Sequence, residues 1–134
     1  MNKTVVVVTL LILVSVGINA QDFKGTNRKE KQVLKLINSL PEVIKENQTR
    51  KKLHLSVFLK AYIQNIPNKT DDCYYVTISE EKGERLFTYD WYKVNSHTYA
   101  VSYYDVINNK AISLKEWRMH KKHQPIKSYH HLAK

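Results

Sequence analysis

Apolar side chains recur at helical spacing in the stretch that follows Asn27. The stripe consists of Val33, Leu36, Ile37, Leu40, Val43 and Ile44. Positions three and four apart share one face of an α-helix, so the pattern predicts an amphipathic helix whose other faces are basic. Asn27, with Glu30 three residues later, forms a capping-box-like pair that marks the start of this helix.

A proline divides the predicted helix. Pro41 lacks a backbone donor and disfavours helical conformation at the preceding residue, which predicts a kink or break at Leu40. Ser39 and Glu42 are then expected to cap the second piece. A basic amphipathic helix can also lie on a membrane, but strands that need a cover follow it, so the stripe is expected to pack on a sheet.

Alternation with a period of two then replaces the helical spacing. Leu53, Leu55, Val57, Leu59, Ala61 and Ile63 share one side of residues 53–63. This pattern predicts a first strand. Three further strands are predicted over residues 73–79, 85–94 and 99–107. The turn EEKGE joins the second strand to the third, and its Gly83 is available for a positive φ.

The order of these elements predicts an α+β domain. An N-terminal helix is expected to pack on a four-stranded antiparallel meander sheet. Ser113 and Glu116 form a second capping box, which predicts a short C-terminal helix. The predicted contacts between the N-terminal helix and the sheet bury Ile37, Leu40, Leu55, Val57 and Leu59.

Aromatic rings are concentrated in residues 89–106, which hold five of the nine tyrosines and one of the two tryptophans. Alternation places rings on both faces of the third and fourth strands, so the face that the helix leaves open is expected to present some of them. The candidate binding residues on this face and its loops are Tyr89, Trp91, Tyr92, Tyr103 and Tyr104. The other interpretation is structural, because cross-strand ring pairs stabilise a sheet by about 0.2–1 kcal/mol each.

The first residues have the layout of a secretory signal peptide. Lys3 precedes an apolar run, and Gly17 and Ala20 follow it. The run is shorter than the roughly 20 residues of a membrane span, and an uncleaved N-terminal anchor is the alternative. The expected organisation is a signal peptide (1–20), a flexible leader (21–26), a single α+β domain (27–123) and a basic tail (124–134). The expected location is secreted or periplasmic, with no transmembrane segment after cleavage.

Charge is distributed unevenly along a chain whose formal net charge is +10. Residues 24–52 carry nine basic and three acidic side chains, residues 115–134 carry six and one, and residues 71–105 carry three and seven. Basic segments around an acidic middle favour an anionic partner, or they match charge within the molecule. An exported chain rarely meets nucleic acid, so no nucleic-acid partner is expected.

No residue pattern points to catalysis. The chain contains no G-x-S-x-G, no H-E-x-x-H and no phosphate-binding glycine loop. Cys73 is the single cysteine, and it is expected to be a buried, inert thiol; an exposed thiol used for dimerisation is the alternative. Four histidines lie late in the chain: His120, His123, His130 and His131. No Cys, Asp or Glu lies among them to complete a zinc site, so neither a metal nor a cofactor is expected.

Three segments between positions 36 and 118 resemble small secreted bacterial α+β domains: INSLPEV, YYVTISEE and YKVNSHTYAVSYYDVINNKAISLKEWR. Those domains pair an N-terminal helix with an antiparallel sheet, in a layout similar to cystatins or to nuclear transport factor two. The resemblance implies a fold and an envelope or extracellular location, and it supplies no catalytic residue. Cystatin-type inhibition would need a Q-x-V-x-G hairpin, where this chain has EEKGE.

These observations favour a secreted, non-enzymatic binding or interaction module of unknown ligand, whose partner is an unknown protein or an anionic surface polymer. The alternative is a basic envelope-associated protein that binds anionic surface polymers through its charged segments. An enzyme of unrecognised type is a third and weaker hypothesis.

Overall fold

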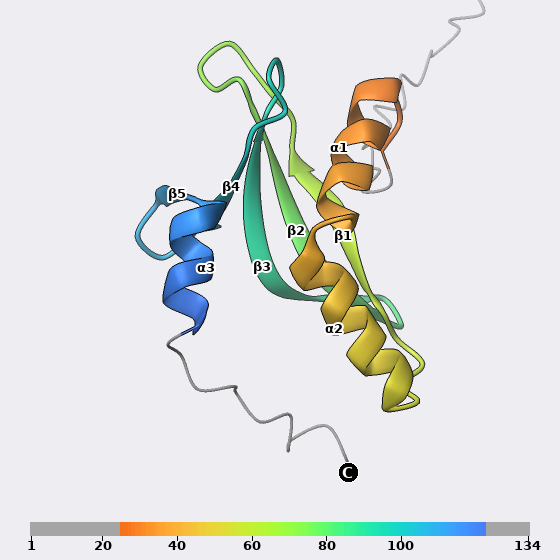
Figure 1. Cartoon of the computed structure of the whole chain (residues 1–134). Helices are drawn as coiled ribbons and strands as arrows, with labels where there is room; N and C mark the ends of the chain where they lie inside the picture. The colour runs from red at the N-terminus through yellow and green to blue at the C-terminus, as the bar shows by residue number, and fades with distance from the viewer. Residues whose placement is uncertain (1–24, 123–134) are drawn as a thin grey trace, which may run out of the picture.

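In the computed structural model, which describes residues 25–122, three helices lie on one face of a five-stranded antiparallel sheet (Figure 1). In chain order the elements are α1 (Arg28–Asn38), α2 (Pro41–Lys52), β1 (Leu59–Asn65), β2 (Cys73–Lys82), β3 (Arg85–Asn95), β4 (Val101–Asp105), β5 (Lys110–Ser113) and α3 (Leu114–Lys122). The strands follow one another in the sheet in sequence order. The α+β class and the meander are confirmed, but the sheet has five strands rather than four.

Several predictions concern segments outside the described residues. The signal peptide (1–20), most of the leader (21–26) and the basic tail (124–134) are among them, as are His123 and the two histidines that follow it. Within residues 25–122, no helix has the length and apolar character needed to cross a membrane.

The predicted start of the first helix is confirmed. The Oδ1 atom of Asn27 accepts the backbone N–H of Glu30 at 2.9 Å, which satisfies one of the free donors at the start of α1. The Glu30 carboxylate reaches one residue further back than a capping box requires and accepts the backbone N–H of Thr26 at 2.6 Å. These bonds fix the entry into α1.

The break at the proline is also confirmed, but its predicted caps are wrong. Pro41 occupies the first turn of α2, where its missing N–H leaves no bond unmade. The N-cap is Leu40, which makes no side-chain capping bond. The Ser39 hydroxyl instead donates back to the Lys35 carbonyl at 2.6 Å and closes α1.

The first strand begins later than predicted, because α2 continues through Lys52. Its end is a left-handed turn at His54, where φ is +55°. The N–H of His54 bonds the Lys51 carbonyl and the N–H of Leu55 bonds the Arg50 carbonyl, the two bonds of a Schellman helix ending. Residues 53–58 therefore form a loop, in which Leu55 is exposed and Val57 is half-buried instead of lying in the core.

Side chains of α1 and α2 cover the outer edge of β1. Asn47 accepts the Leu59 N–H at 2.8 Å and donates to the Leu59 carbonyl at 3.0 Å. Asn38 accepts the N–H of Ala61 at 2.9 Å. These bonds satisfy edge groups that would otherwise be free to pair with another chain.

The core lies between α1, α2 and the concave face of the sheet. Ile37, Leu40 and Leu59 are buried there, as predicted. Burial of an aliphatic side chain of this size contributes about 1.5–3 kcal/mol. The other core members are Val33, Leu34, Val43, Ala61, Ile63, Tyr74, Val76, Ile78, Tyr92 and Val94.

β5, which was not predicted from the sequence, and α3 complete the other side of the helix-covered face. β5 pairs with β4, and the Ser113 hydroxyl caps α3 by accepting the Glu116 N–H at 3.1 Å, as the capping box predicted. Trp117 of α3 stacks on Tyr103 of β4, with ring centroids 4.8 Å apart. Arg118 joins α3 to α2 through a 2.6 Å bond to Glu42.

Candidate binding surface

A β-bulge in β3 decides which rings reach the open face of the sheet. Ile78 lies opposite Asp90, but the next residue of β2, Ser79, lies opposite Thr88. Tyr89 is therefore the extra residue, and the alternation of side chains along β3 is interrupted there. Tyr89 and Trp91, which uninterrupted alternation would place on one face, point to opposite faces.

Three of the five candidate rings, Tyr89 among them, lie on the helix-covered face. Tyr92 has no exposed surface, so its predicted place on the binding surface is wrong. Tyr103 is half-buried against Trp117. The Tyr89 hydroxyl donates to Glu80 at 2.7 Å, and its ring packs 5.3 Å from the Arg50 guanidinium. The structure brings only Trp91 and Tyr104 together on the open face.

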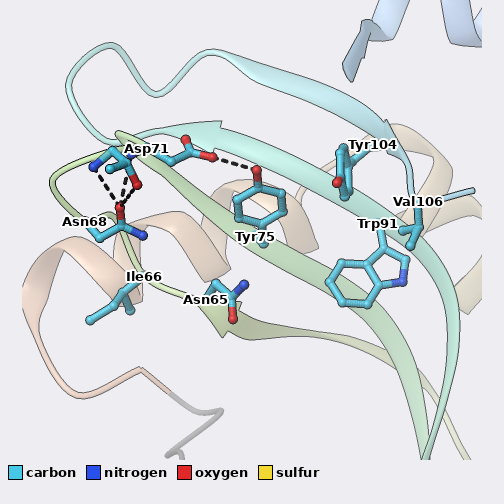
Figure 2. Close-up of a pocket in the computed structure, with 9 residues that line it drawn as sticks. Asn65, Ile66, Asn68, Asp71, Tyr75, Trp91, Tyr104 and Val106 are labelled. Carbon is cyan, nitrogen blue, oxygen red and sulfur yellow. Dashed lines mark hydrogen bonds between the residues drawn. The ribbon is translucent and has the colours of Figure 1, made fainter. Parts of the chain in front are cut away.

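Trp91 and Tyr104 are joined there by Tyr75 of β2, which the candidate residues had omitted. The three rings come from three adjacent strands and line a hollow of about 810 Å³ (Figure 2). The rest of the lining consists of Asn65, Ile66, Asn68, Thr70, Asp71 and Val106. The three helices described above lie on the other face, so none of them covers the hollow (Figure 1).

A charged pair at the rim holds Tyr75 in place. Its hydroxyl donates to Asp71 Oδ2 at 2.6 Å, and the same oxygen receives the Lys93 ammonium at 3.1 Å. The hydrogen bond from Tyr75, helped by Lys93, lowers the pKa of the Asp71 carboxyl. The Tyr75 and Tyr104 rings form a T-shaped pair with a centroid distance of 5.0 Å, a favoured aromatic geometry.

Asp71 is the one carboxylate among the residues that line the hollow, and it is paired with Lys93. The loop that carries Asp71 is ordered by Asn68, whose Oδ1 accepts the N–H groups of Thr70 and Asp71 at 2.9 and 3.1 Å. The side-chain nitrogens of Asn65 and Asn68 make no hydrogen bond within residues 25–122, so they are available to a ligand.

The chemistry considered from the sequence has no counterpart at the hollow. Cys73 begins β2 as a half-buried free thiol, less enclosed than predicted, and burial raises the pKa of that thiol. A raised pKa leaves less of the reactive thiolate at neutral pH. In the described part of the chain, no three His, Cys, Asp or Glu side chains converge in a way that would hold a metal ion.

Comparison of the chain with protein-family models, with curated proteins and with solved structures finds no match. The resemblance to cystatins and to nuclear transport factor two therefore stays a prediction. The candidate surface rests on the geometry of the hollow alone.

Proposed function

We propose that this chain is a secreted, non-enzymatic binding module that takes its ligand at the ring-lined hollow. The observation that carries the proposal is the convergence of Tyr75, Trp91 and Tyr104 on the face opposite the three described helices. Concave sites lined by rings with a few polar groups at the rim are typical of ligand recognition.

The hollow favours a ligand of low net charge. Ring faces offer apolar and quadrupolar contacts, and the free amides of Asn65 and Asn68 offer donors at one end. The single lining carboxylate, Asp71, is balanced by Lys93. Binding here should therefore depend little on salt, in contrast to contacts between exposed charges, which are screened beyond about 8 Å at physiological ionic strength.

The proposal is tested by capture from fractionated extracellular and envelope material on immobilised chain. Replacing Trp91 or Tyr104 by Ala should abolish capture, because aromatic anchors dominate many interfaces. Ile107→Ala is the control, since Ile107 is an exposed apolar side chain of the β4–β5 turn that does not line the hollow. Capture that survives both hollow variants would contradict the proposal.

A second candidate function rests on the exposed lysines of α1 and α2. Lys29, Lys31, Lys35, Lys45, Lys51 and Lys52 make no ion pair with any residue in the described range. Such a surface suits an anionic envelope polymer. Heparin binding that falls steeply with added salt would support this function, and retention that is insensitive to salt would contradict it.

A further inference from the structure

A cluster of exposed apolar side chains lies at the end of the sheet away from the hollow. We call it the apolar tip and define it as Leu53, Leu55 and Phe58 of the loop after α2, together with Phe87 of β3. These side chains are 58%, 37%, 39% and 48% exposed. Contiguous exposed apolar patches on soluble proteins often mark interaction sites.

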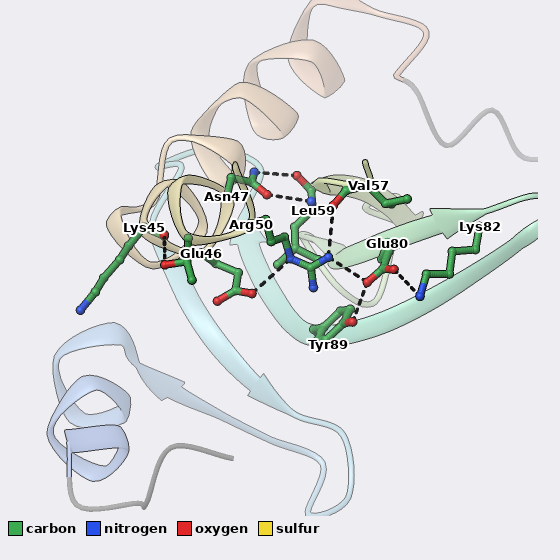
Figure 3. A network of polar contacts seen from close by, with 10 residues as sticks. Lys45, Glu46, Asn47, Arg50, Val57, Leu59, Glu80, Lys82 and Tyr89 are labelled. Carbon is green, nitrogen blue, oxygen red and sulfur yellow. Dashed lines mark hydrogen bonds and ion pairs between the residues drawn. The ribbon is translucent and has the colours of Figure 1, made fainter. Parts of the chain in front are cut away.

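The loop holds these side chains outward by defined bonds. The N–H of Leu55 bonds the Arg50 carbonyl at 3.0 Å, and the Arg50 side chain donates to the Val57 carbonyl at 3.2 Å. Asn47 then fixes the backbone of Leu59 at the loop's other end. The bonds from Asn47 and Arg50 that order the backbone of this loop are shown in Figure 3.

The register of the sheet brings Phe87 to the same end. Leu59, the first residue after the loop, pairs with Glu80, and Glu80 pairs with Phe87 on the next strand. The ammonium of Lys82 lies 5.8 Å from the Phe87 ring. Residues from α2, the loop and the β2–β3 hairpin therefore meet at this end of the molecule (Figure 1).

Basic residues flank the tip residues along the chain. Residues 51–60 contain three lysines, Lys51, Lys52 and Lys60, and no acid. These lysines, and Arg85 of the hairpin, have no ion-pair partner among residues 25–122. Two of the three hairpin carboxylates are engaged inside the protein: Glu80 pairs with Arg50, and Glu81 accepts the Tyr62 hydroxyl.

We infer that the apolar tip docks on an anionic phospholipid surface. Leu53, Leu55 and Phe58 would enter the boundary between headgroups and acyl chains, while the flanking lysines meet lipid phosphates. An anionic lipid surface matches both features. An anionic polymer in water would pair with the lysines and leave the apolar side chains exposed, and a neutral apolar partner would cover the apolar side chains and leave the lysines unpaired.

Docking through the apolar tip leaves the hollow open to a ligand. The inference does not depend on the function proposed for the hollow. β1 begins at Leu59 beside the tip and ends at Asn65 in the hollow lining. At about 3.3 Å per residue, the two ends are roughly 20 Å apart. A chain docked through the tip would hold the hollow away from the lipid.

The test uses a local probe in the full chain. Leu55→Cys in a Cys73→Ser background carries an environment-sensitive fluorophore, and Ile107→Cys in the same background is the control. Ile107 is 94% exposed in the turn between β4 and β5. Vesicles of phosphatidylcholine alone are compared with vesicles of equal parts phosphatidylcholine and phosphatidylglycerol. The label at position 55 should shift to the blue only with the anionic vesicles, and the label at position 107 should not shift.

Variants separate insertion from simple charge attraction. Replacing Leu53 and Phe58 by Ser should weaken vesicle binding about tenfold or more, because two inserted apolar side chains are lost. Ile107→Ser is the matched control and should bind like the parent chain. If the double variant does not fold, Leu53→Ser alone carries the test, since Leu53 is the most exposed member of the tip.

Three results would overturn the inference. One is the absence of a shift at position 55 with anionic vesicles, including the case in which only an envelope protein fraction causes one. Another is an equal shift at positions 55 and 107, which would indicate adsorption of the whole chain. The third is vesicle binding that is unchanged by the Ser variants, which would indicate charge attraction alone.

Discussion

The Arg50 guanidinium donates to the Glu80 carboxylate across 2.9 Å, and both side chains are only 3% exposed (Figure 3). Glu80 also receives the Tyr89 hydroxyl and the Lys82 ammonium. Arg50 also donates to Glu46 at 3.1 Å. This buried network joins the end of α2 to the second and third strands, so it fixes the position of the loop from which the apolar tip projects.

The first prediction concerns this pair. Glu80→Gln should lower the free energy of unfolding by about 3–5 kcal/mol, because it leaves the buried Arg50 charge without its main partner. Replacing both residues by Met should cost much less, since no uncompensated charge remains. Urea denaturation measures both. A double variant as unstable as the single one would contradict this account of the pair.

The second prediction is a pH dependence of stability. Burial alone would raise the pKa of Glu80, but its three hydrogen bonds outweigh burial and hold that pKa at about 2. The ordinary value is 4.5. The contribution of ionised Glu80 to the free energy of unfolding is therefore complete above pH 4.5 and is lost as the pH falls toward 2. It is on the order of 3 kcal/mol. Urea midpoints measured down this range should fall, and should fall less in Glu80→Gln.

The third prediction concerns the covered edge of β1. Asn47→Ala removes both side-chain bonds to the Leu59 backbone, which should cost about 1–3 kcal/mol because buried edge groups lose their partners. The freed edge should also promote association between chains, visible as a concentration-dependent rise in mass by light scattering. Gln48→Ala, at an exposed neighbouring position of α2, is the control. Equal behaviour of the two variants would show that the edge bonds contribute little.

The fourth prediction concerns the left-handed residue that ends α2. A non-glycine residue with the φ of His54 is strained by about 1 kcal/mol or more. His54→Gly should therefore stabilise the fold by about 1 kcal/mol in thermal or urea unfolding. His54→Ala, which keeps a Cβ at this φ, should not. A loss of stability in the Gly variant would mean that the imidazole makes a contribution larger than the strain.

Much of the fold follows from local patterns. The Asn27 cap, the break at Pro41 and the hairpin at Gly83 depend on neighbours in sequence, and all three are present. The loop over residues 53–58 was predicted as a strand because its alternation continues that of β1. Its actual conformation depends on the left-handed ending of α2 and on side-chain bonds from Asn47 and Arg50, which alternation does not reveal. β5 was missed because four residues carry too short a pattern.

The candidate site was only partly predictable. Tyr75 alternates with Tyr74 in β2, so period two alone places it on the open face, and this signal was available in the sequence. Tyr89 is different, because one inserted residue at the bulge reverses the side-chain pattern of β3. The site also needs Asp71 from a loop, and its contact with Lys93 joins positions far apart in sequence.

The most direct test of the central claim uses Trp91 as a reporter inside the hollow. Trp117→Phe leaves Trp91 as the only tryptophan of the chain and keeps an aromatic ring against Tyr103. When the material captured by the parent chain is titrated into this variant, Trp91 emission should change to saturation. The change should be insensitive to salt and lost in Tyr104→Ala. Saturable binding that leaves Trp91 emission unchanged would contradict the claim that the hollow is the binding surface.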